Sequence, residues 1–292
     1  ARMLYEVRVA ANKGLGLFAK LPIPRGTRIL AEKPLVALRS GQRPSDILGY
    51  AKKLDEKSRE QLLGLSWHPG SGIKRLGRWS EALGWAVRNR RTKAIDATMK
   101  AASSSAAYEL ALFPVIARIN HSCLPNAQAN YHPLHRTFNV HATRDIPAGE
   151  EVSINYLPEV GQLQGQRVAK LEEGYGFTCN CPACDLSTNA GKEGEQSRKE
   201  TRDSMKETRA DMPARERQEW LREREIEALN LMLDMYRRED IVGREVASIY
   251  YHLARLQSSG DAFDDALTNA RVGLRLEEDC LGADHPEYLV AL

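Results

Sequence analysis

The chain has 292 residues, of which 42% are apolar and 28% are charged, and its formal net charge is +3. This length allows one large core or two domains. No apolar run approaches the roughly 18 residues that a membrane-spanning helix needs, so we expect no contact with a membrane. The charge is small and forms no basic stripe, so we also expect no direct nucleic-acid binding. The sequence reads as a strand almost from its first residues, and we expect no targeting peptide.

The first 38 residues predict short strands separated by turns. Tyr5, Val7 and Val9 alternate with charged residues, which is the period of a half-buried strand. A glycine-rich turn at 12–16 leads into a second apolar strand. A third strand is expected over 28–38, after a turn at Pro24 to Gly26.

The middle of the chain first loses and then regains these strand signals. Residues 45–110 carry helical patterns, and we interpret them as a helical insertion into a β framework. Residues 126–131 and 137–142 predict a hairpin, and a short alternating strand is expected over 152–156.

Four of the five cysteines form two groups that predict a metal site. Cys179, Cys181 and Cys184 have the spacing C-x-C-x2-C, and Cys123 supplies a fourth thiol 56 residues earlier. Four thiolates are the usual ligands of a closed structural zinc site. A disulfide framework is less favoured because the cysteine number is odd, and a set of ordinary buried thiols is less favoured because the triplet lies in a Pro- and Asn-containing loop. Cys280 lies on a helical pattern and is expected in a core.

The last hundred residues change to helical character. Between 192 and 219, 16 of 28 residues are charged, which predicts a solvated helix or a linker. Apolar residues then recur at helical spacing from Trp220 onward. Residues 251–287 resemble a tetratricopeptide helix pair, with another unit beginning near Leu281. Such pairs bind peptides on their concave faces, so peptide partners are expected here.

Four separated segments together resemble the SET-domain protein lysine methyltransferases. They are the turn at 13–17, the segment Arg118–Asn126 with its Asn-His pair, the segment Gly149–Tyr156, and Gly174–Phe177 followed by the cysteine triplet. The helical insertion and the helical tail are similar to the SET-and-MYND branch or its fungal-type relatives. No Cys or His cluster lies between 40 and 110, where the MYND finger of that branch would stand, so a single zinc ion is expected.

The resemblance implies an α+β fold in which short sheets surround a pseudoknot. It divides the chain into a SET domain at 1–160 with the helical insertion at 45–110, a zinc-binding post-SET loop at 161–187, a charged linker or helix at 188–219, and an all-α tetratricopeptide-like region at 220–292.

The resemblance also assigns roles to single residues. It implies S-adenosylmethionine as the cofactor, held by Lys13, Gly14, Leu15, Asn89, Asn120, His121, Tyr156 and Phe177. Tyr156 and Tyr175 are the implied catalytic residues, and Cys123, Cys179, Cys181 and Cys184 the implied zinc ligands. The other histidines are expected to be ordinary core or surface residues.

The expected activity is methyl transfer to the ε-amine of a lysine in a protein, either a histone or another protein, in the nucleus, the cytoplasm or both. The alternative is a non-catalytic SET scaffold that recognises proteins through its helical C-terminal region. The presence of both tyrosines favours the enzyme.

Overall fold

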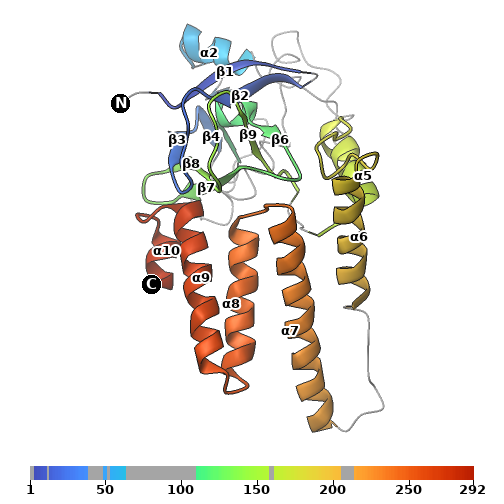
Figure 1. Cartoon of the computed structure of the whole chain (residues 1–292). Helices are drawn as coiled ribbons and strands as arrows, with labels where there is room; N and C mark the ends of the chain where they lie inside the picture. The colour runs from blue at the N-terminus through green and yellow to red at the C-terminus, as the bar shows by residue number, and fades with distance from the viewer. Residues whose placement is uncertain are drawn as a thin grey trace.

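The computed structural model describes residues 3–11, 13–38, 49–50, 53–63, 110–157, 161–204 and 214–292. Most of the expected insertion at 45–110, including Asn89, lies outside these residues. Within it, helix α2 (Glu56–Leu63) agrees with the predicted helical character. Apart from α2 and one 3-10 turn, the described elements up to residue 154 are strands and those after it are helices (Figure 1).

The described strands form three small sheets. The first has the order β1 (Tyr5–Ala10), β2 (Gly14–Ala19), β9 (Glu151–Ile154) and β6 (Asn120–His121). The second has the order β3 (Arg28–Glu32), β8 (Thr137–Ala142) and β7 (Ala127–His132). The third pairs β4 (Val36–Leu38) with β5 (Leu110–Leu112), and a 3-10 turn, η3 (Ile116–Arg118), precedes β6.

These sheets confirm most of the strands expected from the sequence, with two differences. The single strand expected over 28–38 is two strands, β3 and β4, in different sheets, and Pro34, which has no backbone N–H to donate, lies between them. β1 is a strand at the edge of its sheet, but it is not half-buried as its alternation predicted, because Val7 and Val9 are 40% and 78% exposed.

The core includes Leu17 of β2, Phe138 of β8 and Ile116 of η3, which are almost completely buried. The predicted hairpin is β7 paired with β8, in register from Ala127 with Ala142 to His132 with Thr137. The predicted pseudoknot remains a prediction.

Two segments expected to be loop or linker are helical. Helix α5 (Gln164–Tyr175) fills the first half of the predicted post-SET loop. It buries Arg167, Leu171 and Gly174, which share one helix face. The helix ends at Gly176, whose φ of 71° is the left-handed conformation that glycine adopts readily.

Helix α6 (Asn189–Ser204) lies within the stretch predicted to be a charged linker or helix. The helix is confirmed, but it is not solvated on all sides, because Glu195, Arg198 and Thr201 are buried. Charge alone therefore predicted the wrong environment for this face. The buried charges are paired, as described below.

Four further helices follow: α7 (Ala214–Arg238), α8 (Arg244–Ser258), α9 (Phe263–Leu281) and α10 (Pro286–Ala291). They lie side by side below the strands in Figure 1. Leu233, Tyr236 and Leu253 belong to their separate core. Among the described residues, no helix combines the length and the apolar character of a membrane span. The likeness of this region to tetratricopeptide repeats stays a prediction.

The end of α9 and the turn before α10 dock on the β7–β8 hairpin. Asn130 donates a hydrogen bond from Nδ2 to the carbonyl oxygen of Cys280 (3.0 Å), and His285 lies with Nε2 3.0 Å from the carbonyl oxygen of Tyr131. Arg25 forms an ion pair with Asp279 (2.6 Å), and Arg28 forms one with Asp284. Both cores are therefore joined by specific polar contacts.

His132, His135 and Asp284 cluster at this junction, but their hydrogen bonds argue against a metal site. Nδ1 of His132 accepts from the backbone N–H of His135 (3.2 Å), so its proton resides on Nε2. That nitrogen lies 3.2 Å from the carbonyl oxygen of Asp284 and donates to it. Because neither ring nitrogen keeps a lone pair for a metal, His132 is the structural residue expected from the sequence.

His141 makes the stability of the fold depend on pH. Its ring is 1% exposed, and Nε2 accepts a hydrogen bond from Nε of Arg28 (3.2 Å). Burial, followed by the cation of Arg28, lowers the pKa of His141 to about 4. The unfolded chain binds the imidazole proton more tightly than the folded chain does. The contribution of His141 to the free energy of unfolding is therefore complete above about pH 6.5 and is lost as the pH falls toward 4.

We therefore expect the free energy of unfolding to fall by about 1.4 kcal/mol per pH unit from this residue between pH 6 and 4. Denaturant titrations of the wild-type chain and of His141→Gln over this range would measure it. The variant should lose this part of the slope, and identical slopes would contradict the assignment.

Candidate active site and metal centre

The parallel pairing of β6 with β9 brings the Asn-His pair beside the predicted catalytic tyrosine. Asn120 is paired with Ser153, and His121 with Ile154. Nδ1 of His121 accepts a hydrogen bond from the backbone N–H of Tyr156 (3.0 Å). Residues 35 positions apart in the sequence are therefore held together by backbone geometry.

Four rings form an aromatic cluster, which we define as His121, Tyr156, Tyr175 and Phe177. The ring centroids of Tyr156 and Tyr175 are 4.9 Å apart, and those of His121 and Tyr156 are 5.3 Å apart. Phe177 completes the cluster at 6.1 Å from His121 and 6.3 Å from Tyr175. These spacings are those of tilted aromatic pairs. The four residues expected in the site from the sequence thus lie together.

The tyrosine hydroxyls of this cluster donate to backbone carbonyls. Tyr156 donates to the carbonyl oxygen of Ile119 (2.5 Å), and Tyr175 donates to that of Tyr156 (3.2 Å). With its proton engaged, each phenol oxygen keeps lone pairs that can accept a hydrogen bond.

Burial determines the protonation of Tyr156 and His121 in the aromatic cluster. It raises the pKa of Tyr156, and the neighbouring Tyr175 and Glu151 raise it further. Burial also lowers the pKa of His121 to about 4. At neutral pH both groups are uncharged, so Tyr156 is a hydrogen-bonding group and not a base.

The turn between β1 and β2 contributes a polar end to the site. Nζ of Lys13 lies 3.1 Å from Oε2 of Glu151. Nδ2 of Asn120 donates to Oε1 of Glu151 (2.6 Å) and to the carbonyl oxygen of Leu15 (3.2 Å). Gly14 has a φ of +78°, and no atom lies within 4 Å of where its Cβ would be. The turn is therefore open at this point.

Glu151 was not identified as a site residue from the sequence. It links Lys13 with Asn120, and it approaches the backbone so closely that a Cβ on Gly16 would lie 2.7 Å from its Oε1. In the sequence, Glu151 is only the second of two adjacent glutamates at the start of a predicted strand. The direction of its side chain follows from the pairing of Phe18 with Glu151 between β2 and β9.

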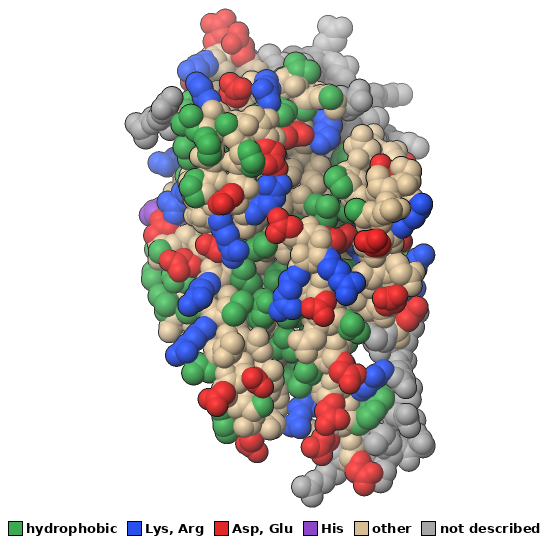
Figure 2. All heavy atoms as spheres, in the orientation of Figure 1, with side chains coloured by type: hydrophobic (Ala, Val, Ile, Leu, Met, Phe, Trp, Pro, Cys, Tyr) green, Lys and Arg blue, Asp and Glu red, His purple; other side chains and the backbone are tan. Residues whose placement is uncertain are grey.

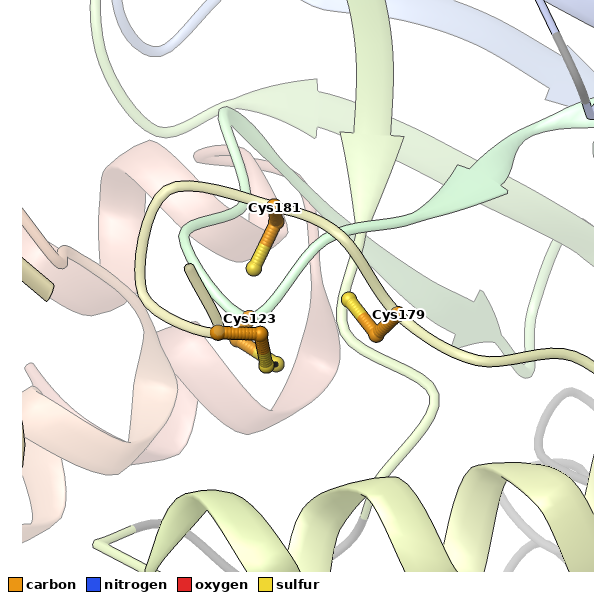
Figure 3. Close-up of side chains that lie close together, drawn as sticks. Cys123, Cys179 and Cys181 are labelled. Carbon is orange, nitrogen blue, oxygen red and sulfur yellow. Dashed lines mark hydrogen bonds between the residues drawn. The ribbon is translucent and has the colours of Figure 1, made fainter. Parts of the chain in front are cut away.

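The four cysteines predicted to bind zinc come together between β6 and the loop after α5. Figure 3 shows Cys123, Cys179 and Cys181 pointing toward a common centre. The Sγ atoms of all four, including Cys184, lie within 4.8 Å of one another, and those of Cys123 and Cys184 are 3.6 Å apart. A tetrahedral zinc site with Zn–S of about 2.3 Å requires S–S distances of about 3.8 Å. The donor set and its size therefore fit zinc.

Gly14 and Leu15, which were also predicted to hold the cofactor, begin β2, and the carbonyl oxygen of Leu15 faces Asn120. Cys280 is buried in α9, away from the cysteine cluster. Nε2 of His121 is 3.3 Å from Sγ of Cys123, which joins the aromatic cluster directly to the cysteines. The four-cysteine cluster and the aromatic cluster are thus in direct contact.

Comparison with known proteins identifies the class to which this arrangement belongs. Residues 14–157 match the SET domain family, so the chain carries a SET domain.

Two named proteins are also similar in sequence to this chain. The chain is 32% identical over 185 residues to histone-lysine N-methyltransferase set5 of Schizosaccharomyces pombe. The aligned residues make up 63% of this chain and 51% of that protein. It is 41% identical over 68 residues to protein-lysine N-trimethyltransferase SMYD5 of Gallus gallus, covering 22% of this chain and 16% of that protein. The chain thus spans about half the length of the first relative and less of the second.

Among solved structures, Rubisco LSMT bound to sinefungin and monomethyllysine aligns with a TM-score of 0.42 and 14% identity, covering 100% of this chain and 83% of that one. The family assignment rests on the sequence matches.

Proposed function

We propose that the chain is an S-adenosylmethionine-dependent protein-lysine N-methyltransferase that acts on a histone or another protein. One observation carries the proposal: the aromatic cluster, with the Tyr156 and Tyr175 hydroxyls engaged by backbone carbonyls, lies next to the Asn120–Glu151–Lys13 group. The naming of the relatives as lysine methyltransferases supports the same reaction.

The residues present match the chemical groups of the cofactor. The ammonium of Lys13 suits a carboxylate, and the carboxylate of Glu151 suits an ammonium. Phe177, which is half-buried, offers a ring face for the adenine. When bound, the cofactor supplies the methyl group together with a sulfonium leaving group, so the protein chiefly has to orient the substrate.

The chain's own residues would prepare the lysine amine. An ammonium has no lone pair, and an aromatic surrounding lowers the pKa of a lysine by removing water. The phenol oxygens of Tyr156 and Tyr175 can accept N–H hydrogen bonds from the neutral amine, because their own protons are engaged elsewhere. This would orient the amine without a carboxylate base.

The test is methyl transfer itself. The purified chain, loaded with zinc, would be incubated with S-adenosylmethionine carrying a labelled methyl group and with core histones and a panel of lysine peptides. Mass spectrometry should find the label on lysine ε-amines. A folded, zinc-loaded chain that binds the cofactor but labels no lysine in any substrate would favour a recognition scaffold.

Lys13 provides a prediction about the cofactor. We expect Lys13→Met to weaken S-adenosylmethionine binding by about 10-fold to 100-fold, since a charged hydrogen bond contributes about 1.5–3 kcal/mol. Isothermal titration calorimetry would measure this. Lys20→Met, an exposed lysine just past the other end of β2, is the matched control and should bind as the wild type does. Equal weakening in both variants would contradict the role of Lys13.

A further inference from the structure

We propose that Arg167 is the cationic partner of the four-cysteine zinc centre and tunes its affinity for the metal. The inference rests on the zinc centre of the proposed function, and it assigns a role to a residue outside the ligand set. Arg167 lies on α5, 12 residues before the first cysteine of the loop, and is 5% exposed.

The guanidinium of Arg167 contacts both the cysteine loop and one ligand. Nη2 donates to the carbonyl oxygen of Ala183 (2.8 Å) and lies 3.6 Å from Sγ of Cys184. Nη1 donates to the carbonyl oxygen of Gln162. A planar fork of donors can make these contacts together, whereas an ammonium cannot. The side chain therefore holds the loop and faces the sulfur at the same time.

Charge explains why a cation is needed at this place. Four thiolates around one Zn²⁺ leave two negative charges, and Cys123, Cys179 and Cys184 are each about 6–7% exposed. Uncompensated charge is costly in a site with so little water. Arg167 places a guanidinium nitrogen 3.6 Å from one of the four sulfurs. Groups that surround metal ligands in this way typically change metal affinity by about 10–100-fold.

Arg167 and Arg198 are both buried arginines near carboxylates, but they differ in how closely a carboxylate approaches them. The nearest acidic group, Glu195 of α6, is 4.0 Å away, and its Oε2 accepts a hydrogen bond from the backbone N–H of Gln164 (2.9 Å). Arg198, one turn further along α6, forms a buried ion pair with Glu239 of α7. Arg198 is hydrogen-bonded to its carboxylate, whereas Arg167 lies 3.6 Å from the sulfur of Cys184 and 4.0 Å from the carboxylate of Glu195.

Zinc affinity of the full chain, measured by competition with a chromogenic chelator at one pH, tests the proposal. Arg167→Met should bind zinc about 10-fold to 100-fold more weakly. Arg167→Lys, which keeps the charge but not the fork, should lie between this variant and the wild type. Arg198→Met is the matched control: it removes an equally buried arginine of the same region and should keep wild-type zinc affinity even though the fold is destabilised.

Cobalt substitution separates the electrostatic role from a structural one. The charge-transfer absorption of Co²⁺ bound to thiolates should appear at a higher Co²⁺ concentration in Arg167→Met and not in Arg198→Met. Wild-type affinity in Arg167→Met, or an equal loss in Arg198→Met, would overturn the proposal. If Arg167→Met does not fold, Arg167→Lys compared with Arg198→Lys decides, since only the first should bind zinc more weakly. A wild-type chain that binds no zinc would instead refute the zinc centre itself.

Discussion

Replacement of Tyr156 by Phe is expected to lower the rate of methyl transfer by about 10²–10³, the usual cost of removing one preorganised hydrogen-bonding group from an active site. The hydroxyl of Tyr156 is held by the carbonyl oxygen of Ile119, and its oxygen is the acceptor that we assign to the incoming amine. Because the ring and its contacts with His121 and Tyr175 remain, affinity for S-adenosylmethionine should change little. Single-turnover kinetics and cofactor titration on the same sample would separate the two effects.

Tyr236→Phe is the matched control for this variant. Tyr236 is 1% exposed in the helical core, and its hydroxyl has no hydrogen-bond partner among the described residues. Its loss should leave both the rate and the cofactor affinity unchanged. A Tyr156→Phe chain that transfers methyl groups as fast as the Tyr236→Phe chain would remove Tyr156 from the mechanism.

The second large effect is expected at the metal centre. Cys181→Ser should lose tightly bound zinc, and the free energy of unfolding should fall by about 3 kcal/mol or more, because metal that binds the folded chain at about 1,000 times its Kd stabilises it by about 4 kcal/mol. Tyr175, the last residue of α5, and Phe177 come just before Cys179 and pack against the cysteines, so cofactor affinity should fall as well. Metal analysis and denaturant unfolding would measure both quantities.

Cys280→Ala is the control for the cysteine variant. Cys280 is fully buried in α9 but lies outside the cluster, so its removal creates a small cavity and leaves the zinc ligands intact. This variant should still contain one zinc ion per chain. Full zinc content in Cys181→Ser, measured beside this control, would rule out a four-cysteine centre.

Most strands and the grouping of the four cysteines could be predicted because their signals are local or carried by rare residues. The β7–β8 hairpin and the cysteine triplet each lie within a few positions. Alternation in β1 predicted the strand but not its burial, since Val7 and Val9 are exposed at the edge of the sheet. Cys123 could be added to the triplet only because cysteine is scarce. The site residues Asn120, His121 and Tyr156 were found through the resemblance, and the parallel pairing of β6 with β9 supplies the physical reason for their meeting.

Residues whose role depends on tertiary contacts could not be predicted. Glu151 and Arg167 are common charged residues, and nothing in their neighbourhoods distinguishes them from solvated ones. Their roles follow from the orientation of β9 next to β2 and from the packing of α5 on the cysteine loop. Helix α5 itself was missed because its apolar positions are few and its buried face includes an arginine and a glycine.

The expectation that no nucleic acid is bound directly stays a prediction. On the face in Figure 2, Lys and Arg side chains are interspersed with Asp and Glu over most of the surface, and Asp and Glu predominate at the lower end.

Calorimetric titration of the zinc-loaded wild-type chain with S-adenosylmethionine is the most direct test that this SET domain works as a methyltransferase. We expect saturable binding at one site per chain, with one zinc ion per chain in the same sample. A folded, zinc-loaded chain that releases no heat and shows no binding by equilibrium dialysis would contradict the enzymatic function and favour the scaffold.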